Sequence, residues 1–307
     1  MKLVRPHDPW NQAMRRGDFE SAWRETDKLE ALRRRQPPGA CDLLWNGDNP
    51  HGRNVLVRCL HGLGDTIQFS RFLSPLNEIA AQLSVLVQPP LVPLFQNQSG
   101  FGIVRNGWTE WGNTDSALEI EIMELAYAFR VTPATLPLPR LWLSGESRRS
   151  DPILDLLQTS ARKIAIFWAA SGWGGGRHVP FSFFEPLADF SGVQFFSFQQ
   201  GPCEREAEES VLPIHRISEH TADIRDLARA LAEMDLVLTV DTMAAHLAGS
   251  LRIPAWLLLE RMADWRWIEG RDDSPWYPEM RVFREHRGWQ EVIGEILREL
   301  ETTGLQR

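Results

Sequence analysis

Short apolar runs alternate with amphipathic stretches along most of the chain, beginning near residue 54. In the first half, apolar runs predict strands over 55–59, 83–87 and 103–105. Helical spacing of the apolar positions predicts a helix over 66–80, between the first two strands. Because strands that alternate with helices form parallel sheets, this half predicts one doubly wound α/β domain.

The same alternation returns after a proline-rich passage, 132–152, which is typical of a linker. Two such series predict two doubly wound, Rossmann-like domains facing a cleft, over residues 39–150 and 151–307. Ligands of such domains bind outside the carboxyl ends of the strands, so the loops there are the candidate sites. In the second series we expect strands over 163–168, 193–198, 236–240 and 255–259, and helices over 183–190, 224–232 and 243–250.

Residues 1–38 have a different pattern and predict a helical hairpin. Two helical stretches within 8–36 are separated by Gly17, and Phe19 and Trp23 recur at helical spacing. The pattern resembles a single tetratricopeptide unit, with no second copy at a period of about 34 residues. One hairpin cannot bury its own apolar face, so we expect it to pack against the main body.

Composition narrows the possible partners. The chain has 307 residues, with 33 Lys plus Arg against 41 Asp plus Glu and a net charge of −8. This acidic balance argues against nucleic acid as a partner, because phosphate binding needs clustered basic residues. Cys41, Cys59 and Cys203 form no CxxC pair, which fits a reducing cytosol and indicates neither a disulfide framework nor a zinc knuckle. We expect a cytoplasmic protein; peripheral contact with the inner face of the membrane stays open.

The first strand of the first domain runs into CLHGLGDTIQFSR. Gly62 and Gly64 let the backbone approach a ligand, but the third glycine of a dinucleotide fingerprint and the Gly-Lys-Ser/Thr of a P-loop are missing. Asp65 stands at the start of the next helix. It is either a helix cap or a carboxylate that takes a proton from a substrate hydroxyl, and the spacing alone leaves both open.

Two segments of the second domain have features that could bind a diphosphate. In LTVDTMAAHLAGSLRIP, Asp241 and Thr242 follow a buried strand at a helix start, where free N–H groups attract phosphate. His246 lies one turn later on the same face as Thr242; a histidine alone would more often be half-buried and satisfied. The glycine loop of IFWAASGWGGGRHVPFS ends at Arg177, which could neutralise a departing diphosphate or belong to a mobile surface loop.

Tryptophan is concentrated near the carboxyl end. The chain has 13 Trp against 2 Tyr, and the segment DWRWIEGRDDSPWYP interleaves aromatic residues with Arg266 and Arg271. Such side chains can stack on a sugar or pin a long loop to the domain body. We expect mainly a rigid rim, with one or two side chains reaching a bound sugar.

Together these segments resemble glycosyltransferases related to family 9, the ADP-heptose:lipopolysaccharide heptosyltransferases. The likeness is greatest to the bacterial branch that carries tetratricopeptide repeats ahead of the transferase. The resemblance spans about residues 40–300, on NVLVRCLHGLGDTIQFSRFL, KIAIFWAASG, DLVLTVDTMAAHLAGSLRIPAWLLL and DWRWIEGRDDSPWYPEMRVFRE. It implies a GT-B fold and metal-independent, inverting transfer from a nucleotide-sugar, with ADP-heptose a candidate, to a glycan, lipid or protein hydroxyl, without a cofactor.

The resemblance also implies roles for individual residues. Asp65 corresponds to the proposed general base of the family. The sequence differs from the branch in having Leu60-His61 in place of Glu-Gln and Glu124-Leu125-Ala126 in place of Ser-Leu-Pro. The implied donor-binding residues are Ser171, Arg177, Gln199, Asp241, Thr242 and His246, and the acceptor-side loop carries His61, Gly62, Gly64 and Gln68.

The function predicted from these observations is an inverting glycosyl transfer in one displacement. No metal is expected in it, because the sequence has no His, Asp or Glu cluster with ligand spacing. Two alternatives remain at this point. One is a non-catalytic sugar-nucleotide-binding or scaffold protein on the same fold, and the other is a sugar-nucleotide epimerase, which would convert the donor with no acceptor present.

Overall fold

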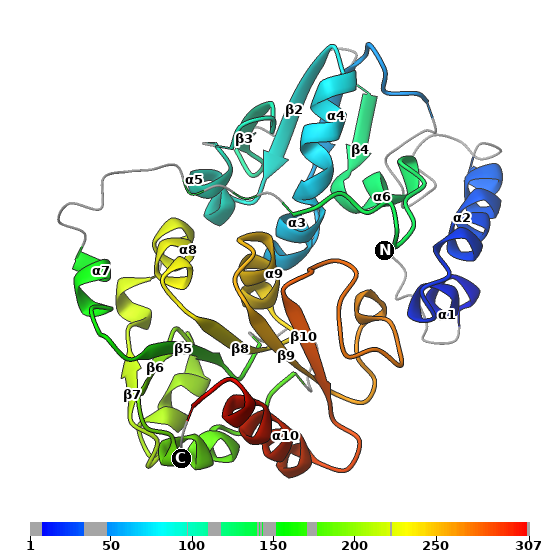
Figure 1. The fold of residues 1–307 in the computed structure, drawn as a ribbon. Helices are drawn as coiled ribbons and strands as arrows, with labels where there is room; N and C mark the ends of the chain where they lie inside the picture. Colours follow the sequence, from blue (N-terminus) through cyan, green and yellow to red (C-terminus); the bar gives the residue numbers. More distant parts are fainter. Residues whose placement is uncertain are drawn as a thin grey trace. The chain divides into compact units, whose positions relative to one another are not determined.

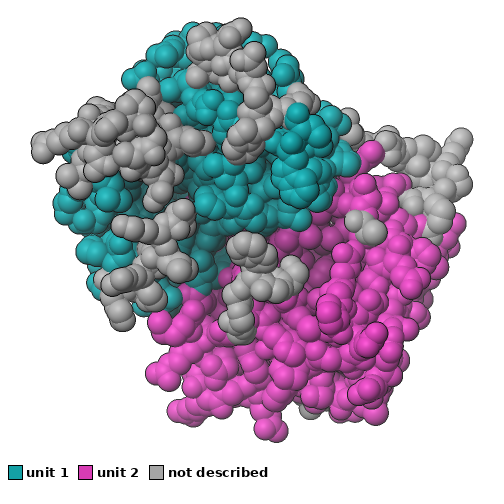
Figure 2. All heavy atoms as spheres, turned by 180° about the vertical axis from the view of Figure 1, so that it is seen from behind, with its two compact units in different colours: residues 1–142, 264–271 teal, residues 143–263, 272–307 magenta. Residues whose placement is uncertain are grey.

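The computed structural model describes residues 8–33, 48–96, 98–109, 118–139, 141, 143, 152–170, 177–221 and 223–305. The chain forms two compact units, coloured separately in Figure 2. Unit 1 comprises residues 1–142 and 264–271, and unit 2 comprises residues 143–263 and 272–307. The segment 264–271 thus belongs to unit 1, whereas the sequence analysis placed it in the C-terminal domain.

Unit 1 contains a four-stranded parallel sheet in the order β3-β2-β1-β4 (Figure 1). The three strands predicted for this half of the chain are confirmed as β1, β2 and β3. The fourth, β4, was not predicted, because acidic and apolar residues alternate in Leu-Glu-Ile-Glu. The strands are β1 (Asn54–Arg58), β2 (Gln82–Val87), β3 (Ile103–Asn106) and β4 (Leu118–Glu121).

The helix expected over 66–80 is interrupted in the structure. It consists of α3 (Leu63–Phe69), a 3₁₀ turn η1 (Ser70–Phe72) and α4 (Leu73–Ile79). Pro75 has no N–H to donate to the carbonyl of Arg71, so a continuous α-helical ladder cannot run through this point. The shorter helices η2 (Pro89–Leu91), α5 (Val92–Phe95), η3 (Ile122–Glu124) and α6 (Leu125–Ala128) complete the unit.

The predicted N-terminal hairpin is present as α1 (Pro9–Arg15) and α2 (Phe19–Arg33). Gly17 makes the turn between them with a φ of 73°, in the left-handed region that glycine adopts without strain. The hairpin packs on unit 1, as expected. The indole N–H of Trp23 donates to the carbonyl of Val131 at 2.7 Å, and the Tyr127 hydroxyl donates to Asp27 at 2.7 Å.

Unit 2 contains a six-stranded parallel sheet in the order β10-β9-β8-β5-β6-β7. Numbered within the unit this is the 3-2-1-4-5-6 order of the Rossmann fold. The four predicted strands are confirmed. Two further strands were not predicted, β7 because it is very short and β10 because two arginines interrupt its apolar residues. The strands are β5 (Arg162–Phe167), β6 (Val193–Ser197), β7 (Ile214–Arg216), β8 (Leu236–Val240), β9 (Ala255–Leu259) and β10 (Met280–Arg284).

Helices cover both faces of this sheet (Figure 1). On one face, Ile164 and Ile166 of β5 pack with Ile293 and Ile296 of α10 (Trp289–Thr302) in a buried apolar cluster. The helix expected over 183–190 lies on this face as a 3₁₀ helix, η4 (Phe181–Asp189), since Pro186 lacks the N–H of an α-helical bond. The other face carries α8 (Ile224–Ala232) and α9 (Met243–Ser250).

Several short helices connect these elements. They are α7 (Pro152–Leu156), η5 (Pro202–Ala207), η6 (Ser218–His220) and η7 (Trp265–Trp267). Among the described residues, no helix is long and apolar enough to cross a bilayer.

Candidate functional site

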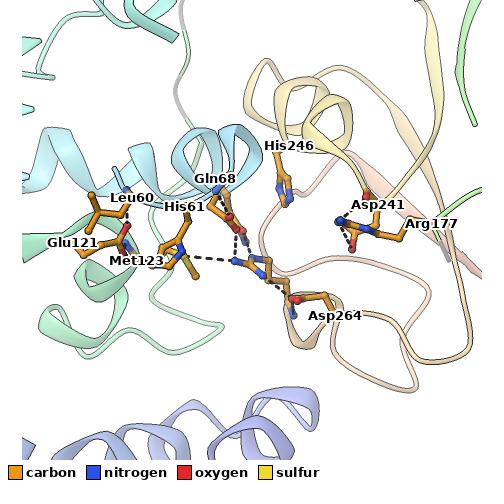
Figure 3. A network of polar contacts seen from close by, with 12 residues as sticks. Leu60, His61, Gln68, Glu121, Met123, Arg177, Asp241, His246 and Asp264 are labelled. Carbon is orange, nitrogen blue, oxygen red and sulfur yellow. Dashed lines mark hydrogen bonds and ion pairs between the residues drawn. The ribbon is translucent and has the colours of Figure 1, made fainter. Parts of the chain in front are cut away.

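The strand order of unit 1 reverses between β1 and β4, so the loops that follow these two strands lie next to each other. The residues after β1 contact the end of β4 (Figure 3). The Leu60 N–H donates to Glu121 Oε1 at 3.4 Å, and His61 Nε2 lies 3.8 Å from Glu121 Oε2. This switch point is where a doubly wound sheet binds its ligand.

Asp65 is the third residue of α3, at this switch point. Its Oδ2 accepts the N–H of Gly62 at 2.9 Å, which closes a cap on the helix. Its Oδ1 lies 2.5 Å from Nη2 of Arg266. The side chain is 25% exposed, so the carboxylate is a helix cap that a substrate can also reach. Its role as a base stays a prediction.

Arg266 was expected only as part of the tryptophan-rich segment, and its contact with Asp65 was not predicted. It is 8% exposed and lies in the segment 264–271, which packs within unit 1. Its Nε donates to Gln68 Oε1 at 2.7 Å, and its Nη1 donates to Asp264 Oδ1 at 2.8 Å. The guanidinium also lies over the Trp265 ring, 4.7 Å from its centroid. Its Nε, Nη1 and Nη2 atoms each donate to a protein group, so it is a positioning residue and not a platform for a sugar.

Gln68 was predicted on the acceptor-side loop, and the structure buries it completely. Its side-chain oxygen accepts from Arg266, and a role toward an acceptor stays a prediction. No sequence signal could have joined Arg266 to Asp65, because the two residues are 201 positions apart and lie in motifs with no shared pattern.

Two ionisable groups of this site, Glu121 and His61, have shifted pKa values. Burial raises the pKa of Glu121 to about 8, and the negative charges of Glu124 and Asp65 act in the same direction. Burial lowers the pKa of His61. Glu121 therefore holds its proton at neutral pH, and the ion pair of Asp65 with Arg266 lies beside it.

Unit 2 has its own switch point, between β5 and β8. Arg177 follows the glycine loop after β5, and Asp241 follows β8 directly. The structure brings them together: Arg177 Nη1 donates to the backbone carbonyl of Asp241 at 3.1 Å and lies 3.9 Å from its Oδ2 (Figure 3). Ser171, predicted to bind the donor, lies outside the described residues.

Thr242 and His246 lie on α9, as the sequence analysis expected. Thr242 is the N-cap, and its Oγ1 accepts the Ala244 N–H at 3.0 Å. His246 is buried, with Nδ1 2.9 Å from the hydroxyl of the fully buried Tyr277. Gly249 allows this contact, because a Cβ there would lie 2.4 Å from the Tyr277 ring.

Gln199 lies at the end of β6 and is 6% exposed. Its Oε1 accepts the N–H groups of Trp168 and Ala169 at 3.2 and 3.1 Å, and its Nε2 donates to the Gln200 carbonyl at 3.1 Å. The amide thereby ties the end of β5 to the end of β6. A contact with the donor stays a prediction.

Among the residues that the structure describes, one group of side chains in unit 2 could hold a metal ion. The ligand atoms of His178, Cys203 and Glu206 all lie within 4.8 Å of one another. The sequence analysis did not predict this group, because His178 is far from the other two along the chain.

We compared the sequence and the fold with those of known proteins. The sequence matches no protein-family model. Protein FlbA of Caulobacter vibrioides is 25% identical over 292 residues, which cover 85% of this chain and 48% of FlbA. The chain thus spans about half the length of this curated relative. The comparisons give no support for tetratricopeptide repeats.

Two solved structures have the same arrangement of elements. The family 9 glycosyltransferase of Veillonella parvula aligns with a TM-score of 0.59 and 13% identity, over 82% of this chain and 91% of that one. The E. coli ADP-heptose lps heptosyltransferase II aligns with a TM-score of 0.57 and 14% identity, over 81% and 98%. The predicted fold class is confirmed: this chain has the α/β, GT-B fold of the family 9 glycosyltransferase structures, with a helical hairpin at its N-terminus.

Proposed function

We propose that the chain is an inverting glycosyltransferase that uses a nucleoside-diphosphate sugar and needs no metal ion for the transfer. The observation that carries this proposal is that each of two Rossmann-type sheets has a charged group at its switch point. Unit 1 holds a reachable carboxylate, Asp65, and unit 2 holds Arg177 beside the N-terminus of α9. A base and a diphosphate-binding site are the two parts that such a reaction needs.

The proposed reaction is a single displacement. Asp65 accepts the proton of the acceptor hydroxyl as that oxygen forms a bond to the anomeric carbon. The bond from this carbon to the diphosphate breaks at the same time, and its electron pair leaves with the diphosphate. Arg177 and the positive dipole end of α9 stabilise the charge that develops there.

The donor sugar is proposed from the similar E. coli protein, whose name specifies ADP-heptose. A heptose on an adenosine diphosphate is thus the first donor to test, and a glycan hydroxyl is the first acceptor, ahead of a lipid or a protein. We place the reaction in the cytoplasm, with peripheral contact at the inner face of the membrane for a lipid-linked acceptor. Nucleic acid is not a proposed partner, since the chain is acidic.

One observation favours the alternative of a sugar-nucleotide-binding protein without transfer. Both oxygens of Asp65 already accept hydrogen bonds from protein groups, as they would in a purely structural ion pair. The two functions differ in a direct assay, because a binding protein would be stabilised by the donor and release no nucleoside diphosphate when an acceptor is added.

The experiment is a thermal-shift screen of nucleoside diphosphates and their sugars, followed by a transfer assay with chelator present. A ligand at 100 times its dissociation constant stabilises a protein by about 2.7 kcal/mol, a readily measured shift. Stabilisation by ADP-heptose with acceptor-dependent release of ADP supports the proposal. Stabilisation without release supports the binding protein, and the absence of any shift across the screen contradicts both.

A further inference from the structure

The group formed by His178, Cys203 and Glu206 lies in unit 2, and none of its three residues belongs to the proposed donor-binding set. His178 stands on the stem of the glycine loop, where it forms an isolated antiparallel bridge with Ala169. Cys203 and Glu206 both belong to η5 (Pro202–Ala207). The three ligand atoms, one nitrogen, one sulfur and one oxygen, converge within 4.8 Å.

The geometry of η5 explains why two of these residues face the third. A 3₁₀ helix has about three residues per turn, so side chains at i and i+3 lie directly above one another. Cys203 and Glu206 therefore share one face, and that face is turned to His178. Nε2 of His178 lies 2.9 and 3.2 Å from the two carboxylate oxygens of Glu206.

The backbone orients the carboxylate. The N–H of Phe181 donates to Glu206 Oε2 at 2.9 Å, which leaves Oε1 directed at the imidazole. The His178 side chain is 43% exposed, so an ion can reach the group from solvent. Ligands that are already oriented by a neighbouring hydrogen bond, with an open approach, are the usual features of a metal site.

We propose that His178, Cys203 and Glu206 bind a divalent transition-metal ion of the Zn²⁺ class, with solvent in the fourth position. A mixed nitrogen, sulfur and oxygen set selects such an ion over Mg²⁺ or Ca²⁺, which take oxygen ligands. The ion would replace the hydrogen bond between His178 and Glu206. The thiol of Cys203 would lose its proton to solvent as the metal–sulfur bond forms.

The effect of this ion is structural. The stem of the glycine loop is held by backbone bonds from Ala170 to Arg177 at 3.0 Å and from Val179 to Trp168 at 2.8 Å. A metal bridge from His178 to η5 would exchange the existing hydrogen bond to Glu206 for a stronger link directly beside Arg177. The ion would thus fix the position of the arginine without contacting a substrate, and its binding does not depend on the proposed transfer reaction.

Titration of the untagged protein with Zn²⁺, after chelation and in a non-thiol reductant, tests the proposal. One Zn²⁺ per chain is expected, with a rise in melting temperature, and Co²⁺ should give the near-ultraviolet absorption of a cobalt–thiolate bond. Cys203→Ser should abolish that absorption and weaken Zn²⁺ binding by at least about tenfold, because a loss of that size already follows from removing a group that only supports a ligand. Binding should also become tighter as the pH rises, because the thiol must lose its proton.

Glu208→Gln is the matched control, since Glu208 follows the same 3₁₀ helix and pairs instead with Arg216. This variant should bind Zn²⁺ like the unmodified protein. Absence of binding by the folded, unmodified protein would overturn the proposal and leave the group as a hydrogen-bonded cluster. Equal affinity and an unchanged cobalt spectrum in Cys203→Ser would overturn it as well. Because the readout is metal binding, failure here is separate from failure of the transferase proposal.

Discussion

Asp65 keeps room for a substrate even though both of its oxygens have partners. Each carboxylate oxygen can accept two hydrogen bonds, and the contacts with Gly62 and Arg266 use one on each. A substrate hydroxyl can therefore approach a lone pair that remains on a carboxylate whose orientation is already fixed. Fixed orientation is what a general base needs, because proton transfer depends on geometry first.

Replacing Asp65 by asparagine should keep donor binding and remove most of the turnover. The amide retains the size of the side chain and an oxygen for the helix cap, but it cannot accept the proton. A loss of about 10²–10⁴-fold in kcat is expected from removing a general base. Glu119→Gln is the control in the same unit. Transfer at the unmodified rate by Asp65→Asn would mean that Asp65 only caps α3.

Glu121 gives unit 1 a distinctive dependence on pH. Its pKa is raised to about 8 by burial, from 4.5, so the folded state holds this proton where the unfolded state has lost it. The contribution to stability is therefore present at low pH and is lost as the pH rises from 4.5 to 8. Between these two pH values, one group can change the free energy of unfolding by no more than about 1.4 kcal/mol per pH unit.

Denaturant unfolding of Glu121→Gln and of the unmodified protein from pH 5 to pH 9 measures this contribution. The variant should lose less stability than the unmodified protein as the pH rises. Glu119 provides a control of opposite sign in a second series below pH 5: its hydrogen bond to Arg58 lowers its pKa, so its contribution is complete above the unfolded pKa and is lost in acid. Parallel curves for Glu121→Gln and the unmodified protein would show that Glu121 is ionised in the fold.

At the scale of elements, the segment 264–271 supports the candidate base. Arg266 reaches Asp65 and Gln68 with two different nitrogens of its planar fork, which lysine cannot reproduce. Arg266→Lys should therefore lower kcat while the KM for the donor is retained. A fall on the order of 10²-fold corresponds to a displacement of about 1 Å at a catalytic group. An increase in donor KM with unchanged kcat would place Arg266 in donor binding instead.

Trp267 should matter to stability rather than to affinity. Its side chain is completely buried within unit 1, next to residues that contact α1. Truncation of a buried tryptophan typically costs about 3–5 kcal/mol, because it leaves a cavity. Denaturant unfolding of Trp267→Ala should show this loss, and Trp108→Ala, at a tryptophan that is 75% exposed, should show almost none. A weakened donor affinity at full stability would contradict this assignment.

The sequence predicts some elements to the residue and misses others for a physical reason. The strands 236–240 and 255–259 and the helices 224–232 and 243–250 agree with β8, β9, α8 and α9. The two strands are buried on both faces, so their sequences are continuous apolar runs. Strands interrupted by charged residues, such as β4 and β10, give no such run. Contacts over long separations, above all Arg266 with Asp65, have no local signal at all.

At the scale of the whole molecule, the chain passes between the two units three times, near residues 142, 263 and 271. Unit 1 is therefore built from two separate stretches of chain, and the later one brings Arg266 to Asp65 and Glu269 to Arg15. During synthesis the N-terminal stretch is made first, but its partner stretch emerges only after most of unit 2 has been made. Domains usually fold as units in the order in which they are translated. Here the first unit has to wait for the ribosome to reach residue 271, so the second unit is nearly finished before the first can be completed.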